Sequence, residues 1–138
     1  MNSKKEFPII DVAYAKINLG LDIFESKFSF TDKHQIASLF FLFKDINDTI
    51  TIDLSNTDED QIIYKNIIKP KNCLIKKTLE YLRKQQLINN FYKIEVIKNI
   101  PVQSGLGGGS SDAACIIKHL CKDVSNLNLL DLALFIGS

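Results

Sequence analysis

The chain is poor in the residues that mark several classes of protein. Its 138 residues include no tryptophan, three prolines and three cysteines, and no two cysteines form a C-x-x-C pair. Three cysteines in this arrangement indicate neither a disulfide framework nor a zinc site, so we expect reduced thiols in a cytoplasmic protein. Apolar runs such as residues 39–43 are far too short to span a bilayer, and no signal peptide is evident at the start.

The chain also has no large excess of positive or negative charge. The net charge is +1, which gives no overall field to attract nucleic acid or an anionic membrane. The one basic concentration, at residues 65–84, lacks interleaved aromatics and is interpreted as a solvated helix face. With 46% apolar and 24% charged residues, the length fits one domain with a core of its own. We therefore expect a small-molecule partner, and neither nucleic acid nor membrane.

Hydrophobic periodicity predicts four strands before and between the helices. Residues 14–24 alternate with period two, which predicts a strand with one buried face, and residues 36–43 predict a strand buried on both faces. Residues 45–49 are interpreted as a turn and 55–61 as a solvated acidic loop. Further strands are predicted at 50–54 and 91–100.

Three segments have the 3.6-residue period of amphipathic helices. They are residues 72–87, residues 111–124 and a last helix within 125–138, where Gly137 fits the position just past the helix end. His119, on the second of them, is interpreted as a surface or boundary residue. Strands followed by helices on one face predict an α+β domain with a mixed or mainly antiparallel sheet.

Glycine, although scarce, is concentrated in one place. Four of the six glycines lie between Gly105 and Gly109, directly before a predicted helix. Glycine reaches positive φ and lets a ligand touch the backbone, and the helix start offers unpaired N–H groups and the positive end of its dipole. These features predict a phosphate-binding loop, with the hydroxyls of Ser110 and Ser111 available to phosphate oxygens or to a magnesium ion. The predicted loop comprises Pro101, Val102, Gln103, Ser104, Gly105, Leu106, Gly107, Gly108, Gly109, Ser110 and Ser111.

Two common phosphate-binding motifs do not fit this loop. A Walker loop ends in Gly-Lys-Ser or Gly-Lys-Thr, and no lysine occurs between Pro101 and Cys115. The spacing of GLGGGSS also departs from the dinucleotide fingerprint G-x-G-x-x-G. A flexible hinge is the alternative without a ligand, but a hinge rarely opens directly onto a helix start with two serines.

The segment PVQSGLGGGSSDAA resembles the signature loop of the GHMP kinases, which include galactokinase, homoserine kinase, mevalonate kinase and phosphomevalonate kinase. AKINLGLDI and DTITI resemble two strands of that family, and LLDLALFIGS resembles the helix before its Gly-Ala/Ser-Asp-Val-Pro motif. The resemblance spans nearly the whole chain but only about half of the family's usual length. It implies a GHMP kinase N-terminal, ATP-binding domain over residues 1–138: a two-layer α/β sandwich of the left-handed βαβ superfold also found in ribosomal proteins.

The resemblance also implies a reaction. In the most similar members, ATP and Mg²⁺ serve to phosphorylate the 2-hydroxyl of a cytidine diphosphate methylerythritol in non-mevalonate isoprenoid biosynthesis. Lys16 matches the motif lysine and is the candidate catalytic cation, and Ser110 is the candidate magnesium ligand. Asn18 and His34 are candidate substrate-binding residues, although Lys33 stands where the family has a tyrosine that stacks on the base.

The family's catalytic aspartate follows a Gly-Ala/Ser dipeptide, and the last two residues here are Gly137 and Ser138. We therefore expect little kinase turnover from these 138 residues alone. The sequence leaves several functions open: this kinase, another GHMP kinase, a nucleotide-binding protein without phosphoryl transfer, or an RNA-binding module of the same superfold. The low net charge and the phosphate loop argue against the last.

Overall fold

The computed structural model describes residues 6–24, 35–121 and 132. The elements, in chain order, are β1 (Ile9–Phe24), β2 (Gln35–Leu54), β3 (Gln61–Tyr64), α1 (Leu74–Lys84), β4 (Tyr92–Ile97) and α2 (Gly108–Leu120). The strands form one sheet in the order β1-β2-β4-β3. β2 pairs antiparallel with both β1 and β4, whereas β3 pairs parallel with β4. The sheet is therefore mixed, as predicted.

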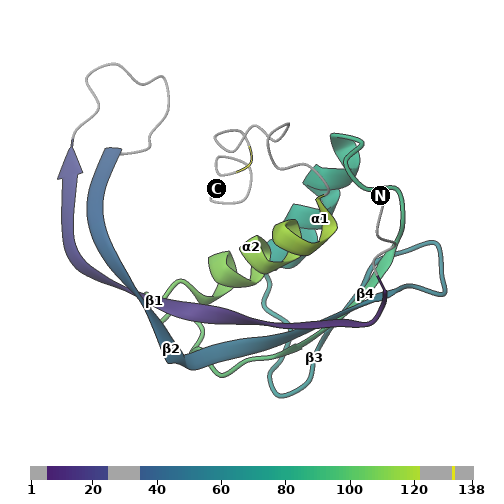
Figure 1. The fold of residues 1–138 in the computed structure, drawn as a ribbon, viewed down its shortest axis with the longest axis horizontal. Helices are drawn as coiled ribbons and strands as arrows, with labels where there is room; N and C mark the ends of the chain where they lie inside the picture. The colour runs from purple at the N-terminus through teal and green to yellow at the C-terminus, as the bar shows by residue number, and fades with distance from the viewer. Residues whose placement is uncertain (1–5, 25–34, 122–131, 133–138) are drawn as a thin grey trace.

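Both helices lie on the same side of the sheet, which makes a two-layer structure (Figure 1). The core between the layers contains Ile50 and Ile94 from the sheet and Leu79 and Ile116 from the helices, all fully buried. The predicted α+β sandwich is confirmed. Neither helix is long and apolar enough to cross a membrane, within the described ranges.

The bounds of both helices differ from the prediction: α1 is shorter, and α2 begins earlier. α1 spans Leu74–Lys84 rather than 72–87, because Gln86 adopts a positive φ of 58° that ends the helix. α2 begins at Gly108 rather than at Ser111, so part of the glycine segment is helical. The helix predicted within 125–138 lies outside the described residues, except for Leu132, which is buried.

The turn predicted at residues 45–49 is wrong. β2 runs without a turn from Gln35 to Leu54 and pairs with β1 along its length. The pairing shifts between Tyr14 and Ala15, whose partners on β2 are Asn47 and Phe43. Residues 44–46 of β2 therefore have no partner on β1. They form an irregularity of the bulge type, which adds residues to one strand without ending the pairing.

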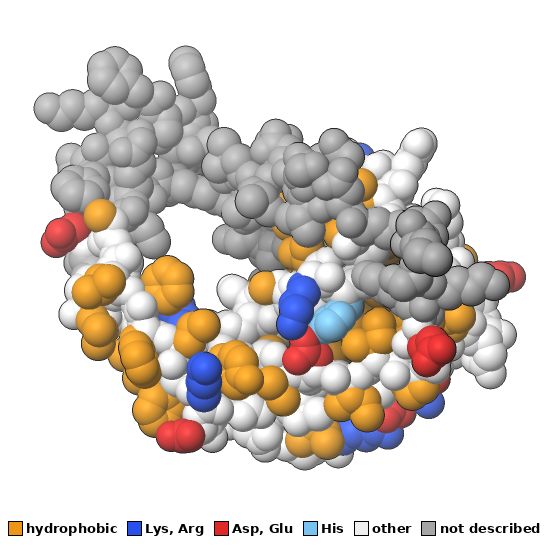
Figure 2. Space-filling model, in the orientation of Figure 1, with side chains coloured by type: hydrophobic (Ala, Val, Ile, Leu, Met, Phe, Trp, Pro, Cys, Tyr) orange, Lys and Arg blue, Asp and Glu red, His pale blue; other side chains and the backbone are white. Residues whose placement is uncertain are grey.

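Beyond that shift, the two strands form an arm, which we define as residues 15–24 of β1 and 35–43 of β2. The arm projects from the rest of the sheet, and neither α1 nor α2 lies over it (Figure 1). Apolar side chains consequently line its surface (Figure 2). The exposed ones are Ile17, Leu19, Leu39, Phe40, Phe41 and Leu42. Ala15, at the base of the arm, is fully buried as predicted, but the burial predicted for Ile17, Leu19 and residues 39–42 is wrong because no described layer covers them.

Candidate functional site

The glycine loop connects β4 to α2 and leaves the start of the helix uncapped. Gly105 and Gly107 have φ of 77° and 71°, in the left-handed region that favours glycine. Gly107 is the N-cap residue, and no side chain makes a capping hydrogen bond there. The first N–H groups of a helix have no partner within the helix, so this turn can donate hydrogen bonds to an anion.

The loop is fixed against β1. The backbone N–H of Lys16 donates to the carbonyl of Leu106 at 2.9 Å, and the Ser111 hydroxyl donates to the carbonyl of Tyr14 at 2.7 Å. A Cβ added to Gly107 would lie 2.9 Å from Cγ of Lys16. Glycine is thus required at Gly107 both by its φ and by the approach of the Lys16 side chain.

A cleft of about 620 Å³ opens beside the loop, within the size range of small-molecule sites. All predicted loop residues except Leu106 and Ser111 line it. The remaining walls are Tyr64, Pro70, Lys71, Asn72, Leu74, Ile75, Lys98 and Asp112. The uncapped helix start and the cleft therefore form one site.

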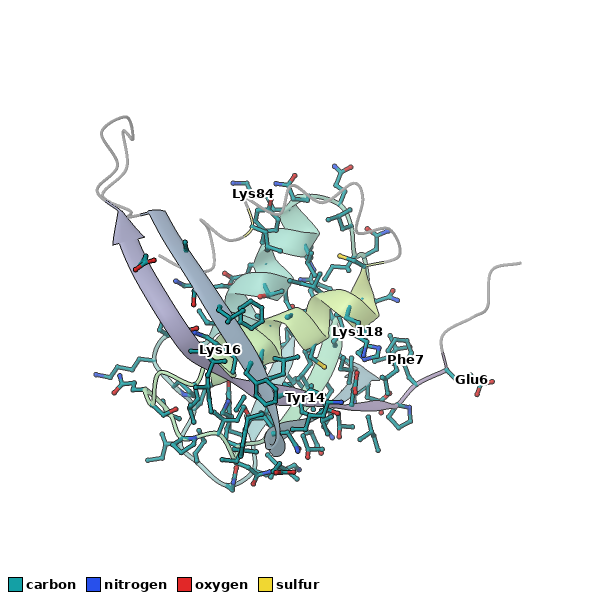
Figure 3. The ribbon with its side chains drawn as sticks, turned by 60° about the vertical axis from the view of Figure 1, so that its left-hand side comes forward. Glu6, Phe7, Tyr14, Lys16, Lys84 and Lys118 are labelled. Carbon is teal, nitrogen blue, oxygen red and sulfur yellow. The ribbon has the colours of Figure 1, made fainter. Side chains whose placement is uncertain are left out.

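Lys16 and Asn18 come together at the edge of this site rather than inside it. The Lys16 ammonium donates to Oδ1 of Asn18 at 3.0 Å, and neither residue lines the cleft. Figure 3 shows Lys16 on β1, beside the loop at the base of the arm. The sequence correctly placed the two on one side of the strand. His34 lies outside the described residues.

Beneath the loop lies a buried charge triad, Lys98, Asp48 and Asp112, that sequence reasoning missed. The Lys98 ammonium contacts Asp48 and lies 2.8 Å from Asp112, and the three side chains are at most 6% exposed. The other Asp48 oxygen accepts the N–H groups of Asn99 and Ile100 at 2.7 and 2.8 Å. The triad thereby fixes the end of β4 and the start of α2, which are the two supports of the loop.

The triad has one cation for two carboxyl groups. Burial raises the pKa of Asp112 to about 7 in spite of the neighbouring Lys98 ammonium, and the Asp48 carboxylate raises it further. One Asp112 oxygen, Oδ1, is buried and makes no hydrogen bond to a described residue. A single lysine thus pairs with two buried carboxyl groups beneath the start of α2. Asp112 lies in the second turn of α2, facing inward.

The connection between β3 and α1 supplies the opposite wall. Lys71 and Asn72 line the cleft and also border a second hollow of about 430 Å³, with Lys69, Lys76 and Lys77. These lysines had been interpreted as a solvated face. Lys69, Lys71 and Lys76 are exposed, in agreement with that interpretation, and Lys71 also adds positive charge to the cleft wall. This placement depends on how the connection folds, which local periodicity does not indicate.

Comparison with known proteins points to one family. Residues 73–138 match the sequence model of the GHMP kinases N terminal domain. The chain is 36% identical over 131 residues to the 4-diphosphocytidyl-2-C-methyl-D-erythritol kinase of Ureaplasma parvum, covering 91% of this chain and 49% of that protein. The Pelagibacter ubique protein of the same name is 41% identical over 116 residues, covering 80% of this chain and 39% of that protein. The chain therefore spans about half the length of the curated relatives it matches.

Solved structures give the same result. A crystal structure of 4-(cytidine 5'-diphospho)-2C-methyl-D-erythritol kinase matches with a TM-score of 0.64 and 26% identity, covering 94% of this chain and 46% of that one. Homoserine kinase from Cytophaga hutchinsonii has a TM-score of 0.63 at 19% identity, covering 99% and 42%, which is a likeness of fold alone.

Proposed function

The chain contains a GHMP kinase N-terminal domain, and we propose that it is the ATP-binding half of a 4-diphosphocytidyl-2-C-methyl-D-erythritol kinase. The proposal is that ATP phosphates bind across the glycine loop while the 2-hydroxyl of the substrate receives the γ-phosphoryl group. The observation that carries it is the uncapped start of α2, which lines a cleft of about 620 Å³. The identity with the named relatives, 33–41% among several of them, supports the choice of substrate.

In this proposal the backbone N–H groups at the start of α2 hold the phosphates. Catalysis of phosphoryl transfer depends mainly on positioning and on neutralising charge. The Lys16 ammonium, held by Asn18 beside the loop, is the candidate for stabilising charge on the group being transferred. Lys71, at the opposite wall, adds positive charge for the nucleotide.

A magnesium ion fits the oxygen donors at this place. Mg²⁺ prefers oxygen ligands and commonly binds through few protein groups together with substrate phosphates. The Ser110 hydroxyl is exposed at the mouth of the cleft, on the first turn of α2. Ser110 and the phosphates of ATP would hold the ion, which neutralises phosphate charge when it is bound.

In the transfer, the substrate hydroxyl oxygen forms a bond to the γ-phosphorus, the bond from that phosphorus to the β–γ bridging oxygen breaks, and ADP leaves. The hydroxyl proton passes to a base, which the family resemblance assigns to an aspartate after a Gly-Ala/Ser dipeptide. We expect the glycine loop to bind ATP, and a positioned base of this kind is typically worth ~10²–10⁴-fold in rate. Asn18 and His34 remain proposed substrate contacts.

The substitution Ser110→Asp tests the nucleotide site. A carboxylate on the first turn of a helix interacts favourably with the dipole, so folding stability should be unchanged or slightly raised. The same charge should repel ATP phosphates and weaken binding at least tenfold, about 1.4 kcal/mol. Titration calorimetry with ATP and with ADP, each with and without magnesium, measures the loss.

Asn56→Asp is the matched control, because it adds the same charge at an exposed position that does not line the cleft. The control should bind ATP as the parent chain does. Equal ATP affinity for the parent, Ser110→Asp and Asn56→Asp proteins would contradict the proposed site.

A further inference from the structure

A second cluster of reactive side chains lies away from the cleft, where α2 crosses β1. It consists of Asp11 on β1 and of Cys115 and His119 on α2. Cys115 and His119 are four residues apart and so share one face of the helix. One ligand atom from each residue, a carboxylate oxygen, the thiol sulfur and an imidazole nitrogen, lies within 4.8 Å of the other two.

We propose that Asp11, Cys115 and His119 form a binding site for zinc or a similar divalent transition metal, which would tie α2 to β1. Thiolate, imidazole and carboxylate are the groups by which proteins bind zinc, and three protein ligands leave a fourth position for water. This proposal does not depend on the nucleotide site, although α2 is shared by both.

The geometry requires only small movements. Zinc–ligand bonds of about 2.0–2.3 Å in a tetrahedral arrangement place neighbouring ligand atoms about 3.3–3.8 Å apart. The Asp11 and His119 atoms, Oδ2 and Nε2, are now 2.6 Å apart and would separate, and the Cys115 sulfur already lies within 4.8 Å of both. Rotation of side chains is sufficient because the Asp11 and His119 side chains are 24% and 20% exposed.

The Lys118 side chain now supplies the positive charge beside the Asp11 carboxylate. The Lys118 ammonium is 2.8 Å from Asp11 Oδ2, and the Lys118 side chain is 68% exposed (Figure 3). Lys118 can therefore turn into solvent when a metal takes its place. On binding, the thiol proton of Cys115 passes to solvent, and the thiolate and carboxylate together match the two charges of the metal.

The alternative is that Asp11, Lys118 and His119 form only a structural ion cluster. The two interpretations differ for Lys118→Met, because this change removes the competing cation. A metal site should then bind zinc more tightly, by several-fold, whereas an ion cluster without metal affinity gains nothing.

The test uses the full 138-residue chain, stripped with a chelator and titrated with zinc in a calorimeter. We expect one equivalent to bind, and cobalt(II) in place of zinc to give visible bands of a tetrahedral ion together with a thiolate-to-cobalt charge-transfer band. Cys115→Ser should remove the charge-transfer band and weaken zinc binding at least tenfold. Cys121→Ser is the matched control, since it removes another buried thiol at the end of the same helix. This variant should keep both the charge-transfer band and the zinc affinity of the parent chain.

If Cys115→Ser does not fold by circular dichroism, His119→Gln replaces it and should weaken zinc binding at least tenfold. The proposal is overturned if the parent chain binds no zinc, or if its cobalt complex lacks the charge-transfer band. It is also overturned if Cys121→Ser loses the band while Cys115→Ser keeps it, or if Lys118→Met leaves the affinity unchanged.

Discussion

The two long strands β1 and β2 pass through two different environments. In the body of the domain, where residues 9–14 pair with 47–52, the helices cover the sheet, and Ile50 and Ile52 are at most 1% exposed. In the arm, the same two strands carry several exposed apolar side chains, such as Phe40 at 61%. Alternating apolar residues therefore specify a strand, but burial also requires a second layer.

Polar groups differ between the two regions in the same way. The body encloses the triad of Lys98, Asp48 and Asp112, whose members are nearly inaccessible to water. Polar contacts of the arm, such as the Ser38 hydroxyl donating to the Gly20 carbonyl at 2.8 Å, are exposed. Because a buried charge that loses its partner is costly and an exposed contact is not, substitutions in the body should have much larger effects.

The largest effect should follow Lys98→Met. This change leaves Asp48 and Asp112 buried near each other without a cation, and breaking a buried pair in this way costs about 3–5 kcal/mol of unfolding free energy. Urea unfolding followed by circular dichroism at pH 7 measures the loss. Lys93→Met, on the strand that ends just before Lys98, is the control: it removes a partly exposed pair with Glu95 and should cost less than about 1 kcal/mol. Equal losses for the two would contradict the distinction between buried and exposed charge.

Ile50→Ala should produce the next largest effect. Ile50 is fully buried beneath the helices, and truncating a core isoleucine costs about 2–5 kcal/mol through lost burial and the cavity left behind. Urea unfolding of this variant gives the reference for apolar burial in the body. A cost below about 1 kcal/mol would indicate that the two layers pack loosely over the sheet.

The sequence was sufficient for features that depend on neighbouring residues. The two amphipathic helices and the glycine segment were predicted from spacing alone, and the structure buries Leu79 and Ile116 on the inner faces of those helices. Asp48 was not: it lies in a segment interpreted as a turn, and its partners Asn99 and Ile100 are 51 and 52 residues away. Such pairings depend on which strands become neighbours, and local periodicity contains no information about that.

Asp60 gives a second example. It belongs to a segment interpreted as a solvated acidic loop, yet its carboxylate accepts hydrogen bonds from the Arg83 guanidinium at 2.9 and 3.0 Å and from the N–H of Tyr92 at 2.9 Å. The acidic residues around it are exposed. Only the fold distinguishes one member of a charge run from the others.

A smaller effect should appear in the pH dependence of stability, with opposite signs at two aspartates. The pKa of Asp112 is raised to about 7 by burial, so the folded state binds more protons than the unfolded state between about pH 4 and 7. Its contribution to stability is therefore present below pH 4 and lost as the pH rises through 7. The pKa of Asp11 is held below its usual range by hydrogen bonds from Lys118 and His119, so its contribution is present above pH 4 and lost at lower pH.

Urea unfolding at intervals between pH 3 and 8 measures both slopes. Asp112→Asn should remove the decline between pH 4 and 7, and Asp11→Asn should reduce the loss below pH 4. If Asp112→Asn left the decline intact, the titrating group would have to be another residue, and the raised pKa assigned to Asp112 would be wrong.

The smallest effect should come from Phe40→Ser in the arm. The Phe40 side chain is already 61% exposed, so little apolar surface returns to water on unfolding, and surface substitutions of this kind usually change stability by no more than about 0.5 kcal/mol. Phe40 pairs with Asn18 across the hairpin, and serine retains the backbone hydrogen bonds of that pairing. Urea unfolding of Phe40→Ser beside Ile50→Ala compares an apolar residue of β2 in the arm with one of the same strand in the body. A loss above about 1 kcal/mol for Phe40→Ser would show that this ring is packed in solution, and the contrast between arm and body would then fail at this position.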